Sequence, residues 1–395
     1  MSNTTLSNAT LSTKGRDTLT AYLLLAPFLV LFVVFLGYPV CYSAVMSLGK
    51  VTLSTDWYRV FQDMGYCGLD NYRRLFTADP EFWWSLVLTL AYAALTIPLG
   101  IALSLGLALL LSNRVKGVAF FRGAFFLPNV LDPLVVGVLW VFICAPQYGL
   151  LEVALRNAAH AAHVSVPPTG PLFPGGLLGN PWTVLPVIAL AMVLKGAGFG
   201  MILFLTAIQN IPGDLYEAAD LDGASAWDKL IHITLPFVKP IILFMLITGV
   251  TGSLNAFTEI YAMTGGEGGP ATEVSLPTGE GFVHLVAWFA LWVAAGGILG
   301  MFIRWAKEIT GLKSETDPWI ARGFMAVAFL AALLTRPHVG RPVHFTGRAA
   351  TVSGFYLFKT FERGDYGYAA AIAFVLMGVA LLISAVNMRL MRQED

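Results

Sequence analysis

Long uninterrupted runs of apolar residues dominate the chain and predict membrane-spanning helices. A helix needs about 20 apolar residues to cross the ~30 Å hydrocarbon layer, because each residue adds only about 1.5 Å. Two weaker runs occupy 283–303 and 319–335, and the second is short and carries Arg322. We expect both to cross, which predicts an all-α polytopic helical membrane bundle of about eight spans. Besides these two, the strong candidates for membrane-spanning helices are 20–45, 84–111, 123–145, 183–208, 237–261 and 366–388.

The composition narrows the class further. Hydrophobic residues make up 57% of the 395 positions and charged residues only 12%, about half the ~25% usual in soluble domains. These values exclude a soluble enzyme, a disulfide-stapled secreted domain and a disordered chain. The formal net charge is +0, so the basic face that nucleic-acid binding requires is not indicated. The 3 cysteines form no CxxC pair and the 6 histidines do not cluster with acids, so we expect no metal site.

Lysine and arginine in the short connections predict the orientation, because these residues favour the cytoplasmic side. Basic residues lie in the tail 1–19 and in the link 112–122, so both belong in the cytoplasm. The segments 46–83 and 146–182 are balanced in charge or nearly uncharged and are expected outside. The chain ends with Arg389 and Arg392, so the C-terminus is also expected in the cytoplasm.

The connection 209–236 is expected inside but is strongly acidic for a cytoplasmic loop. Lys229 is its one lysine between Asp214 and Pro236. Such a loop is unfavourable beside anionic headgroups, so a protein partner is the better interpretation. The acids are Asp214, Glu217, Asp220, Asp222 and Asp228.

The same loop is predicted to form two short helices that are too short to be stable alone. Asp214 is expected to cap the first helix, with Glu217 reaching back three residues later. Gly223 is expected to supply the left-handed turn between the helices, and Ser225 to cap the second. Pro236 is expected to stop that second helix at the membrane.

The loop also carries a recognisable motif, Glu217-Ala218-Ala219, Gly223 and Ile233-x-Leu235-Pro236. It resembles the EAA signature of permease subunits in binding-protein-dependent ABC importers of the carbohydrate-uptake, maltose-type subfamily. The similarity covers about 20–275 and 350–392. Supporting segments are Leu25-Ala26-Pro27 to Tyr38-Pro39, Gly68 to Tyr72, Phe121-Arg122 to Leu127-Pro128, Met263 to Pro270, and Gly367 to Ala370.

The resemblance implies the role of this chain in a larger assembly. The EAA loop (212–236) would dock on a cytoplasmic ATPase and couple ATP hydrolysis to alternating access. The partners implied are a second permease subunit in a heterodimer, two ATPase subunits and an external substrate-binding protein, in a bacterial or archaeal cytoplasmic (inner) membrane. The coupling residues implied are Glu217, Ala218, Ala219, Asp222, Gly223, Ile233, Leu235 and Pro236.

The chain itself is not expected to be an enzyme. It has no GxxxxGK[ST] phosphate loop, so ATP and Mg²⁺ would be held by the partner ATPases and no cofactor by this chain. A di- or oligosaccharide is the expected substrate, with glycerol phosphate or another polar solute as the alternative. A secondary transporter outside the ABC class is a further alternative, but it would be built on internal repeats, which the sequence does not show.

Polar residues within predicted spans are candidates for the substrate pathway, since such groups usually face the interior of a bundle. Lys195 lies mid-span among glycines and could line the route, pair with a carbonyl or contact a partner subunit. A second group of polar residues lies within seven positions, beside Phe257. These side chains could bind a sugar or form hydrogen bonds between helices. The members of this group are Asn255, Thr258, Glu259 and Tyr261.

The chain departs from the family pattern between its last two family-like segments. We divide it into a cytoplasmic tail (1–19), a permease core (20–275), an insertion (276–350) and a last core span with the C-terminus (351–395). The insertion contains both weaker runs, and its function is not readable from the sequence.

Overall fold

A computed structural model describes residue 18 and residues 20–56, 59–112, 117–163, 170–277 and 343–392. The runs 283–303 and 319–335, nearly all of the tail 1–19 and most of the insertion 276–350 lie outside these residues. The chain forms two compact units. The first comprises residues 1–72 and 360–374, and the second comprises 73–359 and 375–395.

Long apolar helices confirm the helical membrane class. Within the described residues, 5 helices are long and apolar enough to cross a membrane, or up to 6 if one bent pair counts as a span. The bent pair is α6 (Val118–Val130) with α7 (Pro133–Ile143). The single helices are Thr20–Ser47, Pro80–Ser112, Val184–Gln209, Ala226–Leu254 and Tyr366–Ala385.

The predicted continuous span 123–145 is broken in the structure. Helices α6 and α7 meet at an angle of 100°. The break falls at Asp132-Pro133, where the carboxylate of Asp132 accepts a hydrogen bond of 2.8 Å from the backbone N–H of Leu134 and so starts α7. A residue before proline avoids helical backbone angles, which explains why an apolar run does not remain one helix here.

The predicted span 237–261 is also interrupted. Helix α12 (Leu235–Leu254) ends at Asn255, and the chain then forms the short α13 (Thr258–Thr264). The Asn255 side chain donates to the carbonyl of Thr251, 2.9 Å away, and so satisfies one of the open carbonyls at the helix end. The prediction from hydrophobicity alone therefore made this span too long.

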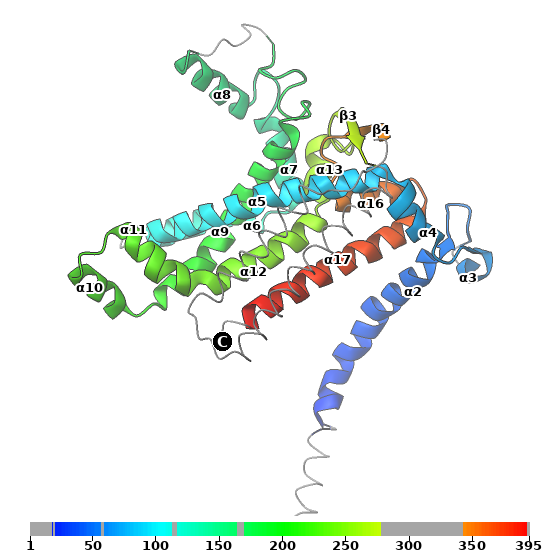
Figure 1. The fold of residues 1–395 in the computed structure, drawn as a ribbon, viewed down its shortest axis with the longest axis horizontal. Coiled ribbons are helices and arrows are strands. Elements are labelled where there is room, and N and C mark those ends of the chain that lie inside the picture. The colour runs from blue at the N-terminus through cyan, green and yellow to red at the C-terminus, as the bar shows by residue number, and fades with distance from the viewer. Residues whose placement is uncertain are drawn as a thin grey trace, which may run out of the picture. The chain divides into compact units, whose positions relative to one another are not determined.

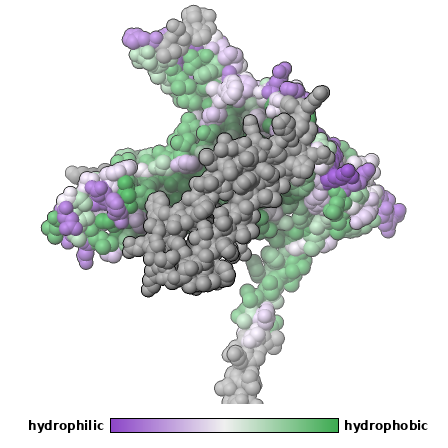
Figure 2. All heavy atoms as spheres, viewed as in Figure 1, coloured by the Kyte–Doolittle hydropathy of each residue, from purple (hydrophilic) through white to green (hydrophobic). Residues whose placement is uncertain are grey.

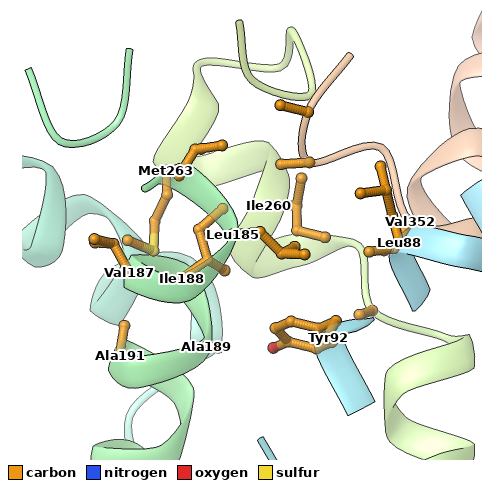
Figure 3. Packing of buried hydrophobic residues seen from close by; sticks show 14 of the residues in the cluster. Leu88, Tyr92, Leu185, Val187, Ile188, Ala189, Ala191, Ile260, Met263 and Val352 are labelled. Atoms are coloured by element: carbon orange, nitrogen blue, oxygen red, sulfur yellow. The ribbon is translucent and has the colours of Figure 1, made fainter. Parts of the chain in front are cut away.

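Three helices form the centre of the second unit: α5 (Pro80–Ser112), α9 (Val184–Gln209) and α12 lie side by side (Figure 1). At one end, side chains from α5, α9 and α13 form a buried apolar cluster that includes Tyr92, Ile188 and Ile260 (Figure 3). A second cluster near the other end of α5 and α9 includes Phe204 and Val238. The two clusters fix the spacing of the three helices.

A short antiparallel ladder joins two segments that are distant in sequence. Strand β3 (Ala271–Leu276) pairs with β4 (Val343–Arg348), so that Leu276 lies opposite Val343. Trp84 of α5 donates from its indole nitrogen to the Arg348 carbonyl at 3.0 Å. The expected all-α class therefore holds for the bundle but not for this ladder, and β4 falls within the predicted insertion.

The remaining elements of the second unit flank the bundle. Helix α8 (Leu150–Ala161) lies in the segment 146–182, and its buried Glu152 accepts a hydrogen bond of 2.6 Å from the Leu172 N–H. The π-turn η3 (Arg74–Ala78) precedes α5, and α16 (Ser353–Glu362) follows β4.

The first unit contains the largely exposed helix Thr20–Ser47, which includes η1 (Val33–Gly37) and α2 (Tyr38–Ser47). A small apolar cluster of Met46, Val51 and Val60 stabilises the first unit, and Tyr366 packs against this cluster. The other elements are β1 (Gly49–Lys50), α3 (Val60–Asp63), β2 (Gly65–Tyr66), α4 (Asp70–Arg73) and the start of α17 (Tyr366–Arg392).

Candidate functional site

The loop between α9 and α12 forms a compact helical hairpin at one end of the bundle (Figure 1). Its first helix, α10 (Gly213–Leu221), has Pro212 at the N-cap position, and no side chain caps it. The prediction that Asp214 caps this helix is therefore wrong. Asp214 lies in the first turn instead, where its negative charge favours the positive end of the helix dipole.

The turn after α10 has the geometry predicted for it. Gly223 adopts φ 75°, in the left-handed region that glycine occupies without strain. Its N–H donates to the Asp220 carbonyl at 3.1 Å, and the N–H of Ala224 donates to the Ala219 carbonyl at 2.9 Å. These two bonds form a Schellman motif, which satisfies carbonyls at the helix end.

The second helix of the hairpin, α11 (Ala226–Lys229), begins with the predicted cap. The Ser225 hydroxyl accepts from the Asp228 N–H at 3.2 Å, and the Asp228 carboxylate accepts from the Ser225 N–H at 3.0 Å. This reciprocal pair is a complete capping box.

The prediction that Pro236 stops the second helix is wrong. Helix α11 continues through a π-turn, η4 (Leu230–Thr234), directly into α12, so that Ala226–Leu254 is one helix of 29 residues. A proline clashes with the carbonyl four residues earlier in a regular α-helix, and the wider π-turn just before Pro236 leaves room for its ring. The hairpin is therefore continuous with a membrane helix.

The hairpin exposes apolar as well as acidic side chains. Leu221 is 90% exposed, Trp227 67% and Leu215 40%. Hydrophilic and hydrophobic residues lie side by side on the surface at this end of the bundle (Figure 2). Of the predicted coupling residues, Glu217, Ala218, Asp222, Gly223, Leu235 and Pro236 are exposed, whereas Ala219 and Ile233 are half-buried. Exposed apolar groups of this size indicate a surface that is covered by a partner.

A pocket of about 340 Å³ lies among α5, α9, α12 and α13. Helix α5 contributes residues four apart, namely Tyr92, Thr96, Gly100 and Ser104, and α12 contributes Met245, Thr248, Gly249, Gly252 and Ser253. Both sets lie on one face of their helix, because residues three and four apart are neighbours on a helix surface. The pocket thus combines hydroxyl groups with aliphatic and aromatic walls.

Two predicted pathway residues, Lys195 and Glu259, line this pocket. The ammonium of Lys195 donates to the carbonyl of Asn129 at 3.4 Å, near the end of α6, so it both lines the pocket and pairs with a carbonyl. Glu259 accepts a hydrogen bond from the hydroxyl of Tyr92 at 3.3 Å.

The other predicted pathway residues do not line the pocket. Asn255 ends α12, and Thr258 is the first residue of α13. Tyr261 packs against the rings of Phe257 and Phe358, with ring centres 5.6 and 5.8 Å away. Sequence reasoning missed Tyr92, Thr96, Ser104, Thr248 and Ser253, although hydroxyl groups four and eight residues apart on the apolar helix α5 were a readable signal.

No group of three or more His, Cys, Asp or Glu side chains suited to a metal is found in the part of the chain that the structure describes. The arrangement is a largely apolar pocket with hydroxyl groups between membrane helices, and a helical hairpin with exposed apolar side chains at the end of the bundle. It defines the class of the chain, a membrane component of a transport system.

The chain belongs to the family described as binding-protein-dependent transport system inner membrane component, whose sequence profile matches residues 100–336. It is similar to the trehalose/maltose transport system permease protein of Thermococcus litoralis, with 32% identity over 68% of this chain and 85% of the relative. The lactose transport system permease protein of Rhizobium radiobacter is 32% identical over 66% of this chain and 83% of the relative.

The fold has a counterpart among solved structures. It is similar to a chain in the crystal structure of a bacterial ABC transporter involved in the import of the acidic polysaccharide alginate, with a TM-score of 0.59 and 19% identity. The match covers 97% of this chain and 98% of that chain. The same fold occurs in the complex of that transporter with an alginate pentasaccharide-bound periplasmic protein.

Proposed function

We propose that this chain is the permease subunit of an ATP-driven ABC importer that carries a di- or oligosaccharide across the cytoplasmic membrane. The observation that carries the proposal is the pocket among α5, α9, α12 and α13. Its hydroxyl groups and aromatic wall suit the alternating polar and apolar surface of a sugar. The printed functions of the trehalose/maltose and lactose relatives support the same substrate class.

The charge of the pocket favours a neutral sugar over glycerol phosphate. Among the lining residues that the structure describes, Lys195 and Glu259 carry the charges, and these are of opposite sign. A phosphate-bearing substrate would require an excess of cationic donors, which this lining does not supply. The alternative substrate is therefore the weaker one.

The hairpin α10–α11 is proposed to dock on a separate ATPase. Its exposed Leu221 and Trp227 provide apolar contacts, and the acids around them provide charge for a complementary groove. ATP and Mg²⁺ are held by two such ATPase subunits, since this chain has no phosphate-binding loop. A second permease subunit completes the channel, an external binding protein delivers the sugar, and both chain ends lie in the cytoplasm.

Co-expression with candidate ATPase, permease and binding-protein subunits tests this proposal. The tagged chain, purified in mild detergent, is expected to retain one ATPase chain type and a second permease chain. After reconstitution into vesicles, uptake of radiolabelled disaccharide is expected to require both ATP and the binding protein. Purification of the chain without an ATPase, or uptake driven by an ion gradient without ATP, would overturn the proposal.

A further inference from the structure

A hydrogen bond joins the coupling hairpin to the start of the membrane helix. The hydroxyl groups of Tyr216 on α10 and Thr234 in η4 lie 2.9 Å apart. Thr234 also donates to the carbonyl of Lys229 at 3.3 Å, so Tyr216 is the donor to Thr234. Thr234 is only 3% exposed, although most residues around it in the hairpin are exposed.

A second polar contact joins the same two segments nearer the turn. Lys229 of α11 forms an ion pair with Asp220 of α10. Tyr216 and Asp220 are four residues apart, which places them on the same face of α10. The two contacts therefore attach one face of α10 to one face of the helix that becomes α12.

The π-turn makes these two contacts compatible. Lys229 and Thr234 are five residues apart, and in a regular α-helix they would point about 140° away from each other, given 3.6 residues per turn. In a π-turn the backbone hydrogen bond runs from residue i to residue i+5, so each residue rotates the chain less and the two side chains come closer to the same side. The turn η4 spans Leu230–Thr234, the interval between the two partners of α10.

We propose that Tyr216 and Thr234 are positioning residues that fix α10 to α12 across the π-turn, so that displacement of α10 by the ATPase moves the membrane helix. This inference rests on the proposed docking of the hairpin on an ATPase. The hydrogen bond transmits the displacement because the helix from Ala226 to Leu254 is continuous. Its far end, away from the hairpin, lines the pocket through Ser253. Without the bond, the Asp220–Lys229 ion pair still attaches α10, but a displacement of α10 on the Gly223 turn moves α12 less.

The test measures sugar transported per ATP hydrolysed in the reconstituted complex. Tyr216→Phe and Thr234→Val each remove the hydrogen bond but keep the size of the side chain. Each is expected to lower the sugar transported per ATP at least about threefold, which is the effect expected from the loss of one hydrogen bond. The double variant should lower this ratio no further, because both substitutions remove the same bond. ATP hydrolysis and retention of the ATPase during purification are expected to stay near the unmodified level.

Two further variants separate positioning from a general loss of folding. Thr234→Ser keeps the hydroxyl and is expected to restore the ratio. Thr206→Val removes an exposed hydroxyl that bonds only within α9, to the Ile202 carbonyl at 2.8 Å, and is expected to leave the ratio unchanged. A misfolded fraction would lower transport and hydrolysis together and leave their ratio unaltered.

The outcomes distinguish the two proposals. If the unmodified chain retains no ATPase, the proposed function fails. If the unmodified complex couples hydrolysis to uptake but Tyr216→Phe and Thr234→Val keep the same ratio, the positioning role is overturned.

Discussion

Tyr92 of α5 donates a hydrogen bond to Glu259 of α13 at 3.3 Å, and both residues line the pocket between the membrane helices. Tyr92 is 4% exposed, and its ring is part of the buried cluster (Figure 3). Its hydroxyl reaches the Glu259 carboxylate. Helix α13 follows the break at the end of α12. The bond therefore holds the carboxylate in place after an interruption in the helix that would otherwise leave it less constrained.

Loss of this bond is expected to reduce uptake. Tyr92→Phe keeps the buried ring and removes only the donor, at a cost of about 1 kcal/mol for one hydrogen bond. We expect the uptake rate of labelled disaccharide to fall several-fold, with a loss of thermal stability limited to that of one hydrogen bond because the ring still packs. Tyr22→Phe on the exposed face of the first long helix is the matched control, and equal uptake by the two variants would contradict the role of the bond.

The charge of Glu259 is expected to set selectivity. Glu259→Gln keeps an oxygen that accepts from Tyr92 but leaves Lys195 as the one charge among the described lining residues. Competition between a neutral disaccharide and an acidic, uronate-containing one should then shift toward the acidic sugar by up to about fivefold, the scale of one solvent-accessible charge interaction. An unchanged ratio would show that the substrate does not pass this carboxylate.

Close helix contact at one glycine gives a prediction about stability. A methyl group at Gly198 would collide with the backbone of Phe125 and lie 2.8 Å from Cα of Phe126, whereas one at Gly196 would meet nothing within 4 Å. Gly198→Ala is therefore expected to lower stability by about 1–3 kcal/mol through overpacking. Gly196→Ala should be neutral or slightly stabilising, and thermal unfolding of the purified protein in detergent compares them.

The hydrophobic runs were sufficient to predict the helical class, because spanning length is a direct consequence of bilayer thickness. Local backbone signals were also readable where one residue determines the geometry. Gly223 forms the left-handed turn and Ser225 caps the second helix, as predicted. Pro236 shows the limit of such rules, since the preceding π-turn removes the clash that would have ended the helix.

Features that depend on distant parts of the chain could not be predicted in this way. The pairing of β3 with β4 joins segments separated by residues 277–342, and no local pattern encodes such a partner. For the pocket, the emphasis on charged residues identified Lys195 and Glu259. The hydroxyl-bearing faces of α5 and α12 carry a weaker signal, since Ser and Thr in membrane helices also bond to their own backbone, as Thr96 does to Tyr92 at 2.8 Å.

The β3–β4 ladder can be tested by a disulfide. Glu273 and Thr346 are direct partners, and both are exposed. Directly opposed residues in an antiparallel pair have Cα atoms about 4.5–5.5 Å apart, within the range a disulfide spans. Glu273→Cys with Thr346→Cys is expected to form the bond under mild oxidation, detected by peptide mass mapping that separates it from the 3 native cysteines.

A second cysteine pair serves as the control for the register of the β3–β4 ladder. Glu273→Cys with His344→Cys places the two thiols diagonally across the ladder, at about 7–8 Å, which is too far for an unstrained bond. Equal oxidation of the two pairs would contradict the register and indicate that the segments slide past each other.

The turn between α10 and α11 gives the last prediction, because its geometry depends on one backbone angle. Gly223→Pro cannot adopt φ 75° and also removes the N–H that bonds to the Asp220 carbonyl. The hairpin should open, so we expect the chain to remain in the membrane fraction but to lose sugar uptake and retention of the ATPase. Gly223→Asn tests whether backbone angle is the cause, since asparagine enters the left-handed region at a cost of only about 1 kcal/mol. Asparagine should therefore preserve most uptake. If the proline and asparagine variants show the same uptake, the turn plays no part in coupling.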